Sequence, residues 1–72
     1  MDQIAIAANA GVDETYTLLG VRADGVASVV DLVPASNLEH ARLRAQAMLA
    51  EHGSCRTIEV WFDGSLVEQH DR

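Results

Sequence analysis

The sequence contains one cysteine, one proline and no lysine among its 72 residues. A single cysteine excludes an internal disulfide and favours a reducing compartment. No apolar run approaches the roughly 20 residues that a membrane-spanning helix needs. The apolar patch near the N-terminus follows an aspartate instead of the positive flank of a secretory signal. We therefore expect a cytoplasmic chain with neither a secretory signal nor a membrane-spanning segment.

Positive charge is also scarce, because five arginines stand against 11 Asp and Glu residues and leave a formal net charge of −6. Affinity for nucleic acid comes mainly from cations that displace phosphate counterions, so we expect no nucleic-acid partner. Anionic membrane surfaces are disfavoured for the same reason. The charge would attract a basic protein, although acidity in a small protein often reflects only solubility.

The length bounds the architecture. A chain of 72 residues, 49% of them hydrophobic, forms one domain and buries only about 60% of its unfolded surface. It is too short for a multidomain enzyme or for a buried cofactor of nucleotide size. Because no disulfide is available, association with a second copy is the simplest further source of stability.

A sustained hydrophobic pattern begins only after the first 13 residues. Residues 1–13 show no sustained period and are predicted to form a flexible tail, with a short strand docked on the sheet as the alternative. Residues 14–72 are predicted to form a single domain. Within it, strand-like runs flank Asp24-Gly25 and again Asp63-Gly64, and each pair of runs predicts a β-hairpin with a tight turn.

A helix is predicted between the two hairpins. The spacing of Ser36 and Glu39 is that of a capping box, and the helix should run from about residue 37 to about residue 52. Its length of roughly 24 Å matches strands of roughly 23 Å. We therefore predict an α+β fold of order ββαββ, a two-layer sandwich with one helix on a four-stranded, mostly antiparallel sheet. The predicted core stripe of the helix is Leu38, Ala41, Ala45, Met48, Leu49 and His52.

The first hairpin is apolar on both faces. A two-residue turn assigns Leu19, Val21, Val26, Val30 and Leu32 to one face. It assigns Tyr16, Leu18, Arg22, Val29, Asp31 and Val33 to the other. A longer loop with a bulge would exchange part of these sets. One helix cannot cover both faces, so we expect apolar surface to be left for a partner or for the tail.

The second hairpin carries the only tryptophan. Pairing across its turn places Val67 beside Val60 in the core, and Leu66 beside Trp61 on the opposite face. We expect this face to hold an apolar patch on the order of several hundred Å², which is unusual on a monomer. The alternatives are that Trp61 is a core residue or that the tail covers it. The predicted interface residues are Tyr16, Leu18, Val29, Trp61 and Leu66.

Residues with catalytic chemistry form no convincing set. Glu59 and Glu68 are predicted to face each other near His70, an arrangement that can serve acid–base chemistry or bind a metal, but that more often marks a solvated face. His52 and Cys55 fall short of a zinc ligand set. The glycines form no phosphate loop. We predict no catalytic residue, no cofactor and no metal site.

Several short motifs occur in a familiar order. Tyr16-Thr17-Leu18 leads to Asp24-Gly25, and an alanine-rich helix is followed by Ile58-Glu59-Val60-Trp61, Asp63-Gly64 and Leu66-Val67. Over about residues 14–70 this order resembles a loose group of small uncharacterised alphaproteobacterial proteins. The resemblance implies the same fold and carries no activity.

Three functions follow from these features. The preferred one is a small non-enzymatic interaction module that forms a homodimer through the sheet face around Trp61. The alternative is an acidic regulatory protein that binds a basic partner, as an antitoxin-like protein or a nucleic-acid mimic does. The third, an enzyme that uses Glu59, Glu68 and His70, has the least support.

Overall fold

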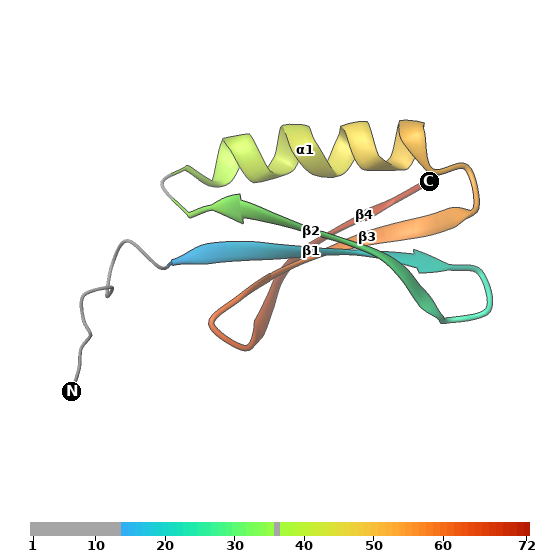
Figure 1. Ribbon diagram of the computed structural model, residues 1–72, viewed down its shortest axis with the longest axis horizontal. Helices are drawn as coiled ribbons and strands as arrows, with labels where there is room; N and C mark the ends of the chain where they lie inside the picture. The colour runs from blue at the N-terminus through green and yellow to red at the C-terminus, as the bar shows by residue number, and fades with distance from the viewer. Residues whose placement is uncertain (1–13, 36) are drawn as a thin grey trace.

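The computed structural model describes residues 14–35 and 37–72. In this part of the chain the elements are β1 (Thr15–Arg22), β2 (Ala27–Pro34), α1 (Leu38–Glu51), β3 (Cys55–Phe62) and β4 (Ser65–Asp71). The strands form one antiparallel sheet in the order β2-β1-β3-β4. The helix lies over one face of it (Figure 1). The predicted α+β fold of order ββαββ is confirmed, and the predicted tail, residues 1–13, lies outside the described residues.

Both turns contain glycine in a left-handed conformation. Gly25 has a φ of 88° and Gly64 a φ of 80°, where a side chain would be strained. The Asp24 carboxylate accepts a hydrogen bond from the backbone N–H of Val26 at 3.1 Å. Each Asp-Gly pair therefore lies in the turn of a hairpin, as predicted, but the first turn is the longer loop with a bulge and not the two-residue turn.

The second hairpin departs from the predicted register. Trp61 pairs with Leu66 as expected, but a shift between Val60 and Trp61 places Glu68 opposite Val60. One extra residue in β4, Val67, produces this bulge. Val67 is consequently 44% exposed and not part of the core, and Glu68 faces the helix.

The helix begins one residue later than expected. Asn37 is its N-cap, and the Asn37 side chain accepts a hydrogen bond from the Glu39 N–H at 2.8 Å. Ser36, the predicted cap, lies outside the described residues. At the other end His52 is the C-cap, and its N–H donates to the Met48 carbonyl at 2.9 Å.

Arg72 completes the C-terminal end of the helix. Its Nε donates to the Cys55 carbonyl at 3.0 Å, and its Nη2 donates to the carbonyls of Leu49 and, at 3.0 Å, of His52. The last turn of α1 contains no basic residue. Arg72, which follows β4, therefore bonds one carbonyl of the last helical turn and two just beyond it, and its charge opposes the negative end of the helix dipole.

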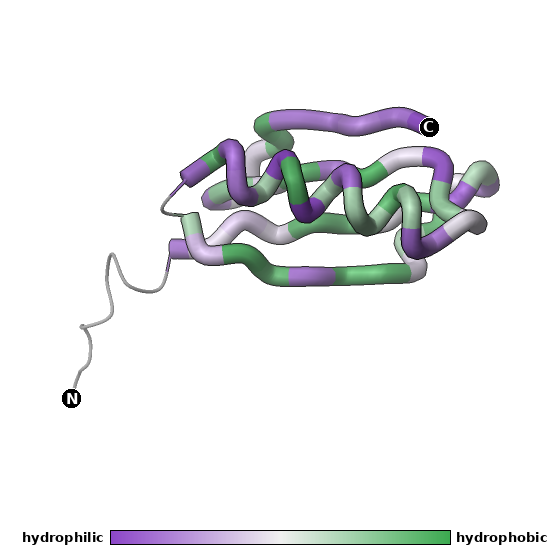
Figure 2. The backbone as a smooth tube through the Cα atoms, turned by 90° about the horizontal axis from the view of Figure 1, so that it is seen from above, coloured by the Kyte–Doolittle hydropathy of each residue, from purple (hydrophilic) through white to green (hydrophobic). Residues whose placement is uncertain are grey.

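The core lies between the helix and the two central strands. Leu18 on β1, with Ile58 and Val60 on β3, is fully buried beneath α1. In Figure 2 the helix runs over strands that are largely hydrophobic. Small residues on the helix let it approach the sheet closely. The predicted stripe is confirmed at its centre, where the fully buried residues are Ala41, Ala45 and Met48.

Candidate interaction surface

The sheet has a second face that no described element covers. Successive side chains of a strand point to opposite faces. Because Leu18 and Val60 point toward α1, their neighbours in β1 and β3 point away from it. We call this side the uncovered face, and its large apolar side chains are Leu19, Val21, Val30, Leu32, Trp61 and Leu66.

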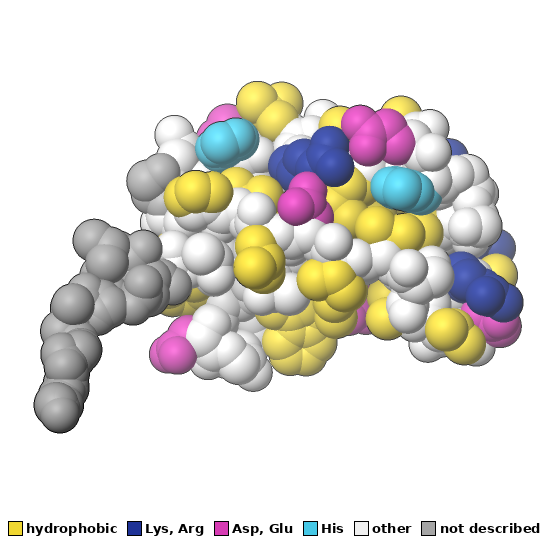
Figure 3. Space-filling view, viewed as in Figure 1, with side chains coloured by type: hydrophobic (Ala, Val, Ile, Leu, Met, Phe, Trp, Pro, Cys, Tyr) yellow, Lys and Arg dark blue, Asp and Glu magenta, His cyan; other side chains and the backbone are white. Residues whose placement is uncertain are grey.

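Several of these side chains are open to solvent. Val30 is 63% exposed, Leu32 60% and Leu66 45%. Leu19, Val21 and Trp61 are half-buried among their neighbours. Figure 3, with the helix uppermost, shows hydrophobic side chains also on the lower side of the molecule, beneath the sheet. An apolar surface that crosses all four strands is the feature expected of a protein interface.

The structure divides the predicted interface residues between the two faces. Trp61 and Leu66 lie together on the uncovered face, as predicted. Leu18 is fully buried under the helix, Val29 packs against the core, and the Tyr16 ring lies 5.3 Å from the ring of Phe62 on that same side. The prediction that these three join the patch was therefore wrong.

The error mainly concerns which face of the first hairpin lies beneath the helix. Leu18 lies opposite Asp31 and Leu19 opposite Val30, as the two-residue turn predicts. Nearer the turn, however, a shift places Val21 opposite Ala27, so the longer loop with a bulge, the stated alternative, closes this hairpin. Pairing of β1 with β3 then decides which face lies beneath the helix, because Leu18 is the neighbour of buried Val60. The face that carries Leu19 is left uncovered.

Trp61 is hydrogen-bonded to a carboxylate on this face. Its indole Nε1–H donates a 3.0 Å hydrogen bond to Oε1 of Glu59. Glu59 is half-buried, and no described cation lies within ion-pair distance of it. The uncovered face thus contains one carboxylate that is partly desolvated and electrostatically unpaired.

The half-buried carboxylates on the helix side are paired with arginine. Arg44 Nε donates to Asp31 at 2.6 Å, and Arg42 Nε donates to Glu68 at 2.7 Å. The hydrogen bond from Arg44 holds the pKa of Asp31 below its ordinary value. The bond from Arg42 similarly lowers the pKa of Glu68. These two pairs tie the helix to the edge strands β2 and β4.

The acid–base candidates do not come together. His70 Nε2 lies 3.1 Å from Glu68 Oε1 on the helix side, whereas Glu59 lies on the opposite face and pairs with Gln69. The bulge in β4 causes this separation. The predicted opposition of Glu59 and Glu68 was therefore wrong, and the described residues contain no group of three side chains able to hold a metal ion.

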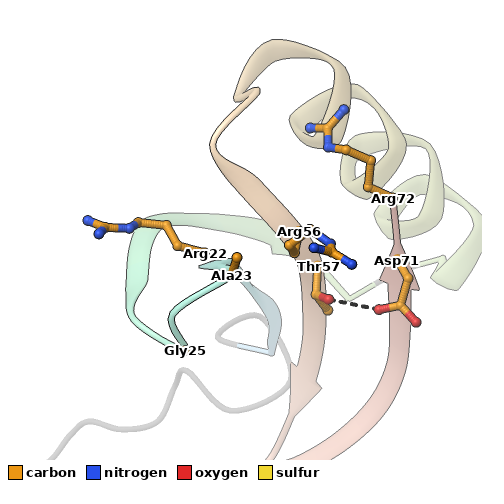
Figure 4. Close-up of a pocket in the computed structure, with 7 residues that line it drawn as sticks. All are labelled: Arg22, Ala23, Gly25, Arg56, Thr57, Asp71 and Arg72. Atoms are coloured by element: carbon orange, nitrogen blue, oxygen red, sulfur yellow. Dashed lines mark hydrogen bonds between the residues drawn. The ribbon is translucent and has the colours of Figure 1, made fainter.

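An open cavity of about 410 Å³ lies where the β1–β2 turn meets the end of β4 (Figure 4). The Asp71 carboxylate accepts hydrogen bonds from Thr57 Oγ1 at 2.7 Å and from Gln69 Nε2 at 3.1 Å, which lower the pKa of Asp71. This site was not identified from the sequence, because its residues come from separate segments of the chain and no spacing pattern connects them. Its lining residues are Arg22, Ala23, Gly25, Arg56, Thr57, Asp71 and Arg72.

The arginines of this cavity differ in their partners. Arg22 Nη2 is paired with the Asp24 carboxylate at 2.5 Å, and Arg72 is bound to carbonyls at the end of the helix. Figure 4 shows the guanidinium of Arg56 between Thr57 and Asp71. Arg56 makes no ion pair with any described residue, but its positive charge contributes to the lowered pKa of Asp71.

Comparison with known proteins identifies no relative. No family model matches the chain, and neither the curated sequences nor the solved structures include a significant match. The helix α1, the one helix of residues 14–35 and 37–72, is too short to cross a membrane.

Proposed function

We propose that the protein is a small non-enzymatic interaction module that forms a homodimer through the uncovered face. The apolar surface of that face carries the proposal. Val30 and Leu32 are each more than half exposed, and Trp61 adds an aromatic side chain of the kind that dominates interfaces. Removing apolar surface from water contributes about 25 cal/mol per Å², so a second copy of the same face is a favourable partner.

The dimensions of the sheet indicate the strength of the dimer. Four strands about 4.8 Å apart, each about eight residues at 3.3 Å, give a face of about 19 by 26 Å, or roughly 500 Å². A standard interface buries about 800 Å² on each partner. The dimer is therefore expected to be reversible, with a dissociation constant on the order of micromolar.

The edges of the described sheet are protected, which favours association through the face. Pro34 on β2 has no N–H to donate, and the N–H of Leu32 donates to its neighbour Asp31 at 2.9 Å. On β4 a bulge at Val67 interrupts the pairing pattern, and charged side chains follow it. Proline, bulges and charges are the usual obstacles to edge-to-edge pairing of strands.

Two matched leucine variants test the proposal. Leu32 on the uncovered face and Leu43 on the outer side of the helix are 60% and 57% exposed. In sedimentation equilibrium we expect Leu32→Ser to weaken the dimer by about tenfold or more, since each copy loses a buried leucine. Leu43→Ser should leave the dimer unchanged. A wild-type chain that stays monomeric at high micromolar concentration, or equal effects of both variants, would contradict the proposal.

Binding of a basic partner stays a prediction from the net charge. Asp24, Asp31 and Glu68 each lie beside an arginine, but the net charge of −6 already counts the arginines and is unchanged by these pairs. The exposed apolar side chains of the uncovered face give the dimer the greater support. Capture of a basic partner should weaken steeply as salt is added, whereas the apolar dimer should respond little.

A further inference from the structure

The uncovered face carries two residues of opposite charge that are able to pair with a second copy. Both are on β3, at Arg56 and Glu59. Residues three apart on a regular strand point to opposite faces, but β3 is irregular here. Because Thr57 pairs with Val21 and Cys55 with Arg22, Arg56 is left as the extra residue of a bulge beside Thr57 (Figure 4).

Among the described residues, neither Arg56 nor Glu59 belongs to an ion pair. The remaining arginines bind carboxylates or carbonyls at the end of the helix. Arg56 and Glu59, together with Asp71 beside Arg56, are therefore the charged groups of this face that can contribute to the proposed interface.

Glu59 is the group that needs a partner in a dimer. It is already half-buried, and its one described hydrogen bond comes from the indole of Trp61. A second sheet laid over this face would remove water from the carboxylate. An ionised carboxylate that loses its water without gaining a cation is strongly destabilising. The two comparable carboxylates of the helix side, Asp31 and Glu68, are both bound by arginine.

Arg56 is the cation that can reach it from another molecule. Its side chain is exposed and lies beside Thr57 and Asp71 (Figure 4). Thr57 and Glu59 are two residues apart on β3, so their side chains point to the same face. The Asp71 carboxylate accepts two hydrogen bonds from uncharged groups, and the positive charge of Arg56 also contributes to its lowered pKa without forming an ion pair. The guanidinium of Arg56 can therefore turn toward a neighbouring molecule without breaking an ion pair.

A twofold axis brings these two groups together. Three residues of a strand span about 10 Å. In a dimer whose two β3 strands lie face to face and run in opposite directions, the twofold axis can lie midway between Arg56 and Glu59. Arg56 of each copy then lies over Glu59 of the other copy. In such an interface residue i contacts j, and j contacts i. We infer that the dimer is held in this register by two reciprocal ion pairs between Arg56 of one copy and Glu59 of the other.

The apolar residues fit the same register. Leu19 is the β1 neighbour of Glu59, and Val21 is the β1 neighbour of Thr57. The axis therefore stacks Leu19 of one copy near Val21 of the second. An axis through Glu59 itself would instead oppose two like charges, which costs several kcal/mol at an interface. Charge thus selects the register, and apolar contact supplies the driving force.

This inference rests on the proposed dimer, and charge reversal tests it separately. We expect Arg56→Glu and Glu59→Arg, each alone, to weaken the dimer by about tenfold or more, because each creates two like-charge contacts. An equimolar mixture of the two variants should recover association as a heterodimer, since both of its contacts again join opposite charges. The double variant Arg56→Glu/Glu59→Arg should recover the homodimer.

Sedimentation equilibrium at low and high salt gives the readout, and circular dichroism checks that each variant is folded. Glu59→Arg also loses the bond to Trp61, so recovery in the mixture is the decisive result. A wild-type dimer that Leu32→Ser weakens, with no effect of either charge reversal or no recovery on mixing, would overturn the register and leave the dimer intact. Absence of a wild-type dimer would overturn both.

Discussion

The indole of Trp61 and the carboxylate of Glu59 form a hydrogen-bonded pair, 3.0 Å apart, on the sheet face opposite the helix. Two residues apart on one strand, they share a face, and so the bond runs along β3 and not across the sheet. The pair presents an aromatic surface to solvent while it holds a charge beside that surface. Any partner of this face must accommodate both groups.

Trp61 should report association directly, because it is the only tryptophan. As the concentration rises through the micromolar range, we expect its emission maximum to move to shorter wavelength, since a second sheet excludes water from the indole. Leu32→Ser should abolish the concentration dependence. Leu43→Ser, on the outer side of the helix, should preserve it.

Gly20 should not tolerate a side chain. A Cβ at this position would lie 2.8 Å from Cys55 Sγ and 3.2 Å from Val29 Cβ. We expect Gly20→Ala to lower the free energy of unfolding by about 1–3 kcal/mol through overpacking, as measured by urea denaturation. Cys55→Ala removes the closest atom, so the double variant should lose less stability than the two single changes together. Simple additivity would argue against the close contact.

Arg72 should stabilise the fold through the end of the helix. Arg72→Gln should lower the free energy of unfolding by about 1–2 kcal/mol, because hydrogen bonds to three carbonyls lose their charged donor. Arg56→Gln is the matched control, since Arg56 has no described ion pair, and it should change the stability by less than about 0.5 kcal/mol. Equal losses from the two variants would rule out the capping role.

Acid should destabilise the protein through three carboxylates. The pKa values of Asp31, Glu68 and Asp71 are lowered by hydrogen bonds to their charged forms, from Arg44, Arg42 and Thr57 respectively. A carboxyl whose folded pKa lies below its unfolded pKa adds stability above the unfolded value, near 4. That stability is lost as the pH falls through the folded pKa. Urea denaturation between pH 7 and pH 2 should therefore show a decline that begins near pH 5.

Removing the arginines identifies the source of this decline. Arg44→Gln and Arg42→Gln should each reduce the difference in stability between pH 7 and pH 2, because the carboxylate they contact loses its charged donor. The pairs are partly exposed, so added salt should also reduce it. A decline that is the same in the wild type and in both variants would show that these pairs do not contribute.

Local signals in the sequence account for the elements and for their order. The Asp-Gly pairs at residues 24–25 and 63–64 each close a hairpin because they tolerate the backbone conformation of a tight turn. The buried stripe of the helix follows from its period. These features depend on a few neighbouring residues, and they could therefore be predicted without knowledge of the tertiary structure.

The candidate interface depends on contacts between distant segments, and its prediction was only partly correct. Both faces of the first hairpin are apolar, and only the pairing of Leu18 with Val60 decides that Leu18 lies inside. Either register of β4 satisfies the alternation, so the bulge at Val67 leaves no local signal. Arg72 reaches carbonyls about 20 residues away in the sequence, and no spacing rule relates them.

The translational diffusion coefficient of the wild-type chain, measured by NMR from about ten micromolar to about one millimolar, tests the central claim most directly, because a reversible dimer in this range changes in population with concentration. We predict that diffusion slows from the monomer value toward the dimer value, and that Leu32→Ser keeps the monomer value at the same concentrations. A wild-type coefficient that stays at the monomer value throughout would contradict the account.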